Sequence, residues 1–270
     1  MSLNCLAAGL SDKGMVRDGN EDSILVAPDL NLYVVADGMG GHNAGEIASK
    51  MAVDVLRDYI SRTAAGGEVL IGRHDQSVSD TANHLASGIK LANRVIYESA
   101  QSNPAWKNMG STIVAVLLED ERLSIAHAGD SRAYLIRGES IIQLTDDHSL
   151  VAEQVRKGLI SREDAETSTR RNIITRGLGV DLELEVDLSD LPVTDGDRIL
   201  LCSDGLSNML TDQAIAAITQ GYRDPLEVCQ KLIEEANRSG GTDNISAVII
   251  MISGRKMSGL SRMFNWARSS

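Results

Sequence analysis

Acidic side chains beside apolar, strand-like segments are the residues of this sequence best suited to chemistry. The segment "NLYVVADGMGG" runs into Asp37 and Gly38, and "RILLCSDGLS" repeats the pattern at Asp204. Each acid alone is most simply a turn residue, because Asp-Gly pairs are common in turns. Together they indicate a site, since strands of a sandwich end at the same edges. Further acids in comparable positions are Glu21, Asp22, Asp130 and Asp243.

Carboxylates gathered in one cleft repel one another unless cations neutralise them. Hard divalent ions such as Mg²⁺ or Mn²⁺ prefer oxygen ligands from carboxylates, backbone carbonyls and water. Gly38 has no Cβ, so we expect its carbonyl to turn toward a metal beside Asp37. Two metal ions in an acidic cleft are suited to hydrolysis of a phosphate ester, because each ion lowers the pKa of a bound water.

An anionic substrate would also need a positively charged side chain. Arg17 lies four residues before Glu21, and its planar guanidinium matches two phosphate oxygens. Arg132 and Arg176 are possible alternates, and for Arg132 the simpler interpretation is a surface arginine.

Composition excludes several classes of protein. The 270 residues carry a formal charge of −12, which argues against nucleic acid as a partner. No segment reaches the roughly 18 unbroken apolar residues of a membrane span, and the N-terminal residues lack a secretory pattern. Three cysteines without close spacing favour a reducing cytosol, so we expect a cytoplasmic protein. The five histidines show no paired metal-ligand spacing.

Short apolar runs and helical periodicities predict the elements that must position these acids. The segment 111–144 reads as a meander of antiparallel hairpins, with turns at 119–121, Gly129-Asp130 and 138–139. Helices fall between groups of strands without alternating with them, which favours two packed antiparallel sheets with helices outside. Other strands are expected at 6–10, 23–27, 32–36, 198–203 and 244–252, and helices at 44–62, 81–100, 149–157, 161–167, 211–219 and 224–238.

The chain divides by composition near its C-terminal end. Residues 1–253 contain no linker or long repeat, so we expect one domain. The segment 254–270 is a basic, amphipathic tail, with four basic and no acidic residues among its last sixteen. It is either a frayed or packed end, or a segment that docks on a membrane surface or a partner protein.

Eight ordered segments resemble a known family, the metal-dependent PPM, or type 2C, Ser/Thr protein phosphatases, and especially its prokaryotic branch. The resemblance covers about 5–250. The matching segments are "RDGNEDS", "VADGMGGHNAGEIAS", "MGSTIVAVL", "AHAGDSRAYLIRG", "LTDDHSL", "ITRGLG", "LLCSDGLSNML" and "GGTDNISAVII".

The resemblance implies an α+β fold, a four-layer α-β-β-α sandwich, with two Mn²⁺ or Mg²⁺ ions in the cleft between the sheets. Asp37 would bridge both ions, and Asp204 and Asp243 would complete the first site. Gly38, through its carbonyl, and Glu21, through water, would bind the second ion.

Three further roles follow from the same resemblance. Asp130 together with Asp204 would form a weaker third metal site. Arg17 would clamp the substrate phosphate, and Asp22 would orient metal-bound water.

The sequence departs from many relatives at one position. Met39 stands where they have a histidine proposed as the general acid, so the proton would come from metal-bound water or from His42. The charged segment 149–175 resembles by position a mobile flap that shapes the choice of protein substrate.

The activity implied is hydrolysis of phosphoserine and phosphothreonine in proteins by a monomer that opposes a Ser/Thr kinase. Two alternatives stay open. One is an inactive regulatory or binding protein that keeps the fold, although all the matched metal positions retain their acids. The other is a phosphohydrolase acting on small molecules.

Overall fold

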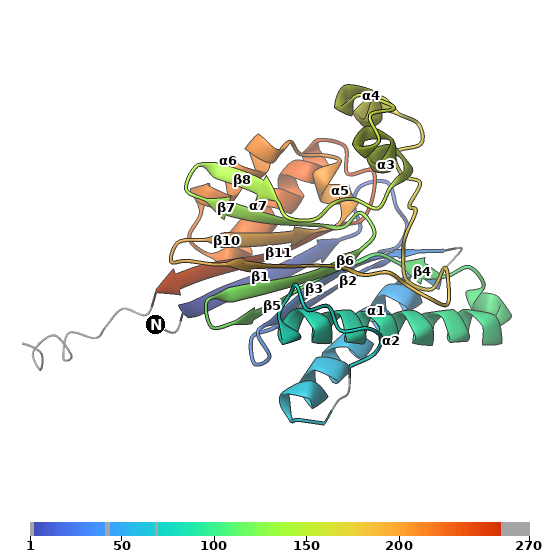
Figure 1. Cartoon of the computed structure of the whole chain (residues 1–270). Coiled ribbons are helices and arrows are strands. Elements are labelled where there is room, and N and C mark those ends of the chain that lie inside the picture. The colour runs from blue at the N-terminus through green and yellow to red at the C-terminus, as the bar shows by residue number, and fades with distance from the viewer. Residues whose placement is uncertain (1–2, 41–43, 68–69, 255–270) are drawn as a thin grey trace, which may run out of the picture.

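Two antiparallel sheets packed face to face form the centre of the molecule. The computed structural model describes residues 3–40, 44–67 and 70–254. Helices cover the outer face of each sheet (Figure 1), so the predicted α+β sandwich of two antiparallel sheets flanked by helices is confirmed.

The first sheet has the strand order β1-β11-β10-β7-β8. Strands β1 and β11 pair along their whole length, from Leu3 opposite Gly254 to Asp12 opposite Ile245. The two ends of the described chain therefore lie side by side (Figure 1). The strand bounds are β1 (Leu3–Asp12), β7 (Arg132–Arg137), β8 (Ser140–Gln143), β10 (Arg198–Cys202) and β11 (Ile245–Gly254).

The second sheet has the order β2-β3-β5-β6-β9, and a short strand, β4, pairs with the end of β3. Each strand of β2-β3-β5 lies antiparallel to its neighbour. The bounds are β2 (Asp22–Ala27), β3 (Leu32–Met39), β4 (Gly110–Ser111), β5 (Ile113–Glu119), β6 (Arg122–Ala128) and β9 (Asp187–Pro192).

Strand β3 shows why the central strands read as continuous apolar runs. Successive side chains of a strand point to opposite faces. Tyr33 and Val35 pack between the two sheets, while Val34 and Ala36 pack with the helices on the other face. Both faces of the strand are buried, so neither can be polar.

The expected helices are present with bounds close to those predicted. α1 (Ala44–Ala64) and α2 (Asp80–Ser102) cover the second sheet, and α6 (Asp212–Gly221) and α7 (Pro225–Arg238) cover the first. Asp224 caps α7, since its side chain accepts a hydrogen bond from the Leu226 amide at 2.9 Å. The remaining helices are short: α3 (Leu150–Arg156), α4 (Arg162–Thr167), α5 (Asp204–Ser207) and the 3₁₀ turn η1 (Pro104–Trp106).

Two sequence-based predictions are wrong in detail. The strand expected at 32–36 does not end there, because β3 continues through Asp37 and Gly38 to Met39. The Gly129-Asp130 turn does not join a hairpin, because β6 belongs to the second sheet and β7 to the first. This turn carries the chain from one sheet to the other.

One end of the sandwich collects the acidic segments. Asp22 and Asp37 lie opposite each other where β2 begins and β3 approaches its end. Strand β10 ends just before Asp204, β11 begins just after Asp243, and β6 ends just before the Asp130 turn. The topology therefore brings segments that are remote in sequence to a single edge.

Candidate metal centre

Asp22 and Asp37 lie opposite each other at the site, on the neighbouring strands β2 and β3. The Oδ2 atom of Asp22 accepts hydrogen bonds from the hydroxyls of Ser203, at 2.8 Å, and Ser246, at 2.7 Å. Its Oδ1 atom is buried and has no hydrogen-bond partner among the described residues. A buried carboxylate oxygen without a partner is unfavourable, and a bound cation or its water would satisfy it.

The electrostatics of the site are those of acids held together without enough positive charge. Burial raises the pKa of Asp22 and of Asp130 to about 7. Burial also raises the pKa of Asp37 well above its usual range. Nearby negative charges raise it further, and they belong to Asp22, Asp204, Asp130 and Asp243. Divalent cations resolve such repulsion, and the all-oxygen donor set fits Mn²⁺ or Mg²⁺.

Gly38 and Gly45 make room for the approach of β3, α1 and the Glu21 carboxylate. A Cβ on Gly38 would lie 2.2 Å from the Gly45 carbonyl oxygen, and a Cβ on Gly45 would lie 2.7 Å from Glu21 Cδ. The Gly38 amide donates to the Glu21 carbonyl at 3.1 Å. Glycine is therefore required at position 38 by close packing, a reason that the sequence did not reveal.

Asp204 and Asp243 enter the site from the other sheet. Asp204 is the first residue of α5, and Asp243 precedes β11. Burial and the charge of Asp243 raise the pKa of Asp204, while a hydrogen bond with Asp37 lowers it. Asp204 of the first sheet thus lies within electrostatic reach of Asp37 of the second, and a cation shared by the two would be held by both sheets.

Asn244 positions the loop that carries Arg17, and sequence reasoning did not single it out. Its side-chain amide donates to the carbonyls of Lys13, at 2.9 Å, and Gly19, at 2.8 Å. Its Oδ1 atom accepts from the Glu21 amide at 2.8 Å. The only sequence signal was its place directly after Asp243 in "GGTDNIS".

The three candidate arginines differ in what they bind. Arg17 is 52% exposed and pairs with Asp243 at 2.7 Å. Arg132 is instead a largely buried structural arginine, with Nε 2.9 Å from Asp147 Oδ1 and Nη2 2.7 Å from Oδ2. The interpretation of Arg132 as a surface residue is therefore wrong. Arg176 pairs with Glu185 and with Asp187, so Arg17 is the arginine that lies among the acids of the cleft.

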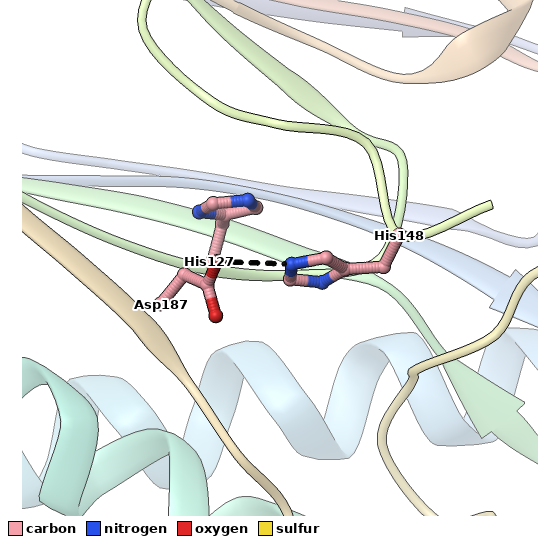
Figure 2. A group of neighbouring side chains, drawn as sticks. All are labelled: His127, His148 and Asp187. Atoms are coloured by element: carbon pink, nitrogen blue, oxygen red, sulfur yellow. Dashed lines mark ion pairs between the residues drawn. The ribbon is translucent and has the colours of Figure 1, made fainter. Parts of the chain in front are cut away.

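A second cluster lies near the site and joins His127, His148 and Asp187 (Figure 2). The two imidazole rings are stacked with their centroids 4.7 Å apart, and His148 Nε2 lies 3.2 Å from Asp187 Oδ2. These residues are far apart in sequence, so their spacing gave no sign of the cluster.

The Met39 side chain packs closely against two glycines, since Cβ atoms on Gly110 and Gly177 would lie 2.9 and 2.8 Å from its Cε. His42 lies outside the described residues.

Comparison with known proteins identifies the family to which this chain is similar. Residues 16–238 match the family described as Protein phosphatase 2C. The chain is 39% identical to the serine/threonine phosphatase stp of Listeria innocua, over 89% of this chain and 93% of that protein.

Solved structures agree with the sequence comparison. One is the catalytic domain of the serine threonine protein phosphatase PstP in complex with two manganese ions. Its TM-score is 0.80 at 34% identity, covering 94% of this chain and 100% of that one. Another is the serine/threonine phosphatase Stp1 of Staphylococcus aureus, with a TM-score of 0.81 at 36% identity, covering 94% and 98%.

The chain therefore belongs to the protein phosphatase 2C family. The resemblance carried by the eight segments is confirmed, and so is the enzyme class, a protein phosphatase. Within the described residues, no helix is both long and apolar enough to cross a membrane.

Proposed function

We propose that this protein hydrolyses phosphoserine and phosphothreonine in proteins with the help of Mn²⁺ or Mg²⁺. One observation carries the proposal: buried acids from both sheets, Asp22, Asp37, Asp130 and Asp204, converge at one edge of the sandwich, and burial raises their pKa values. Relatives named serine/threonine phosphatase support the substrate class, and the two manganese ions of PstP support the metal.

The acids of the two sheets would hold the ions together. Asp37 would bridge two ions, and Asp204 and Asp243 would complete the first site. Gly38, through its carbonyl, and Glu21 would serve the second site. When bound, the ions neutralise the substrate phosphate and activate water for attack on phosphorus. Asp130 and Asp204 would hold a third ion, because each lies within the electrostatic reach of the other.

Two residues would act without binding metal directly. Arg17 uses one N–H donor on Asp243, and a guanidinium has five, so further donors can bind two oxygens of a substrate phosphate. Asp22 is held by Ser203 and Ser246 beneath Asp37. Its partnerless Oδ1 would orient the water of the metal site.

The proposal extends to the whole chain. Residues 1–253 form the catalytic domain, and 254–270 form a basic tail, which is either a frayed or packed end or a segment that docks on a membrane surface or a partner protein. Beyond Gly254 this tail lies outside the described residues. The protein acts as a cytoplasmic monomer in signalling and opposes a Ser/Thr protein kinase.

Metal-dependent turnover tests the proposal directly. The protein is treated with EDTA and assayed on p-nitrophenyl phosphate and on a phosphothreonine peptide, with and without added Mn²⁺. We expect release of phosphate from both substrates only with the metal.

Two outcomes would contradict the proposal. The absence of metal-dependent release between pH 7 and 9 would indicate an inactive regulatory protein. A strong preference for nucleotides or sugar phosphates over phosphopeptides would indicate a small-molecule phosphohydrolase.

A further inference from the structure

The segment 149–175, here called the flap, leaves and rejoins the sandwich at one place. It carries α3 and α4, which stand beyond the ends of the sheets (Figure 1). The residue before the flap is His148 and the residue after it is Arg176. Whatever fixes these two residues therefore fixes both ends of the flap.

The two ends of the flap are paired with each other by backbone hydrogen bonds. The Leu150 amide donates to the Ile173 carbonyl at 2.8 Å, and the Thr175 amide donates to the His148 carbonyl at 2.8 Å. A single bridge between Ser149 and Ile174 lies between them. The base of the flap is thus a short antiparallel pair.

His148 fastens this base to the turn that carries Asp130. Its amide donates to the Gly129 carbonyl at 3.0 Å, and the Gly129 amide donates to its Nδ1 atom at 3.1 Å. Gly129 has φ of +115°, and a Cβ there would lie 2.5 Å from Thr112 Cβ. The turn has little room to shift, so His148 joins the flap to a fixed point beside Asp130.

The direction of the Gly129 bond also settles the chemistry of the His148 ring. A neutral imidazole accepts at one nitrogen and donates at the other. Nδ1 accepts, so Nε2 carries the hydrogen and donates to Asp187, 3.2 Å away. Arg176 Nη1 lies 3.1 Å from the same nitrogen, and because Nε2 is then a donor, this guanidinium binds Asp187 and not the ring. His127 stacks on the ring, and its Nε2 lies 2.9 Å from the Asp146 carbonyl, which completes the support.

Asp187 is the common partner of both ends of the flap. It lies on β9, opposite His127 of β6, and its carboxylate binds His148 and the guanidinium of Arg176. The hydrogen bond from His148 and the charge of Arg176 hold the pKa of Asp187 below its usual range. One carboxylate on the sheet thus ties the residue before the flap to the residue after it.

The same contacts make this cluster a poor metal site, although its ligand atoms are close together. The imidazole nitrogens named above already have partners, and Arg176 places a positive charge beside Asp187. A cation would have to displace these partners and approach the guanidinium.

We infer that His148, Arg176 and Asp187 are positioning residues that hold the flap in a fixed position relative to the Asp130 turn. A protein substrate, which extends beyond its phosphorylated side chain, then meets a rim already in place at the cleft. A small phosphate ester does not need this rim. The inference rests on the proposed phosphatase function, and it assigns part of the protein-substrate selectivity to the flap base.

Hydrogen exchange tests the positioning role without any assay of activity. In Asp187→Asn and Asp187→Ala, we expect the amides of Leu150 and Thr175 to exchange about tenfold faster than in the wild type. The matched control is Glu185→Gln, which removes the 80% exposed partner of the same arginine and should leave exchange unchanged. Equal exchange in all four proteins would overturn the inference.

Loss of stability alone must be separated from loss of the flap base. Asp190 lies on the same strand and accepts hydrogen bonds from Ser79 and Ser124, away from the flap. We expect Asp190→Asn to lower the melting temperature without selective exchange at Leu150 and Thr175. The same selective exchange in Asp190→Asn would also overturn the inference.

Kinetics provide a second readout. We expect Asp187→Asn to raise KM for a phosphorylated protein about fivefold while kcat changes less than about twofold. We expect Arg176→Ala to do the same and Arg176→Lys to recover part of the loss, because lysine keeps the charge. Equal losses on p-nitrophenyl phosphate, or no rise in KM, would contradict the selectivity role. A wild-type protein without metal-dependent turnover would instead refute the proposed function and leave the exchange result as the test.

Discussion

The carboxylates of the cleft have surroundings opposite to those of two carboxylates that pair with arginine, Asp187 at the flap base and Asp197 at the far end of the first sheet. In the cleft, burial raises the pKa of Asp22 and Asp130 to about 7. At the flap base, a hydrogen bond from His148 and the charge of Arg176 lower the pKa of Asp187. At the end of the first sheet, Arg137 binds Asp197 through two nitrogens, and the pKa of Asp197 is also lowered. The same residue type is crowded with like charges in one region and paired with arginine in the other.

This difference separates function from architecture. Acids paired with arginine stabilise the fold as it stands, because each charge is compensated by the chain itself. Acids gathered without such partners destabilise the fold until something else brings positive charge. Four predictions test this division, from the largest expected effect to the smallest.

Removal of one charge at the centre of the cleft should have the largest effect. In Asp37→Asn, we expect Mn²⁺-dependent turnover of p-nitrophenyl phosphate to fall at least about 10³-fold, because the bridging ligand is lost. The metal-free melting temperature should rise, since one of the mutually repelling acids becomes neutral. Asp54→Asn, an exposed site on α1 paired with Lys50, is the control. Near-normal turnover of Asp37→Asn would remove the residue from the centre.

Withdrawal of metal should weaken the fold as a whole. At a free Mn²⁺ concentration about 100 times Kd, we expect the free energy of unfolding to exceed that of the EDTA-treated protein by about 2.7 kcal/mol. Urea denaturation with and without Mn²⁺ measures this difference. A protein equally stable in both conditions would mean that the cleft acids do not gather around a cation.

An acid paired with arginine should show the opposite behaviour. Asp197 is 1% exposed, and we expect Asp197→Asn to lower the free energy of unfolding by about 2 kcal/mol at pH 7 while turnover is kept. The pKa of Asp197 is lowered in the folded state, so its stabilisation is complete above the unfolded pKa, about 3.9. It is lost as the pH falls through the lower folded value. The stability difference between wild type and variant should therefore shrink in acid, and a constant difference would contradict the assignment.

Among the described residues, Arg17 is the positively charged side chain that pairs with an acid of the cleft. Its loss should have the smallest of the four effects. In Arg17→Ala, we expect KM for a phosphopeptide to rise about tenfold, with a smaller fall in kcat, if it binds the ground-state phosphate. Arg57→Ala, on the exposed side of α1, is the matched control. An unchanged KM would leave the phosphate clamp to another group.

Much of this arrangement could be predicted from the sequence, because its signals are local. Apolar runs ending near acids gave the strands, and the helical periodicity gave α1, α2 and α7 within a few residues. Strand β9 was missed because "DLSDLP" has no apolar run. Two of its acids, Asp187 and Asp190, bind the flap base and the start of α2.

Other features depend on pairing across the chain. The Gly129-Asp130 turn has the residues of a hairpin, and only the pairing of β7 with β10 shows that it crosses between sheets. The stacking of His127 on His148 and the anchoring by Asn244 join remote segments in the same way. Such contacts leave no periodic trace in a single sequence.

The full-length pairing of β1 with β11 has a consequence for biosynthesis. Strand β1 is translated before the strand beside it in the sheet, which follows only after nearly all the rest of the domain. Until then, β1 presents unsatisfied backbone groups that can pair with another nascent chain. The first sheet therefore closes late, and a nascent chain that stops short of β11 would be a substrate for chaperones or proteases.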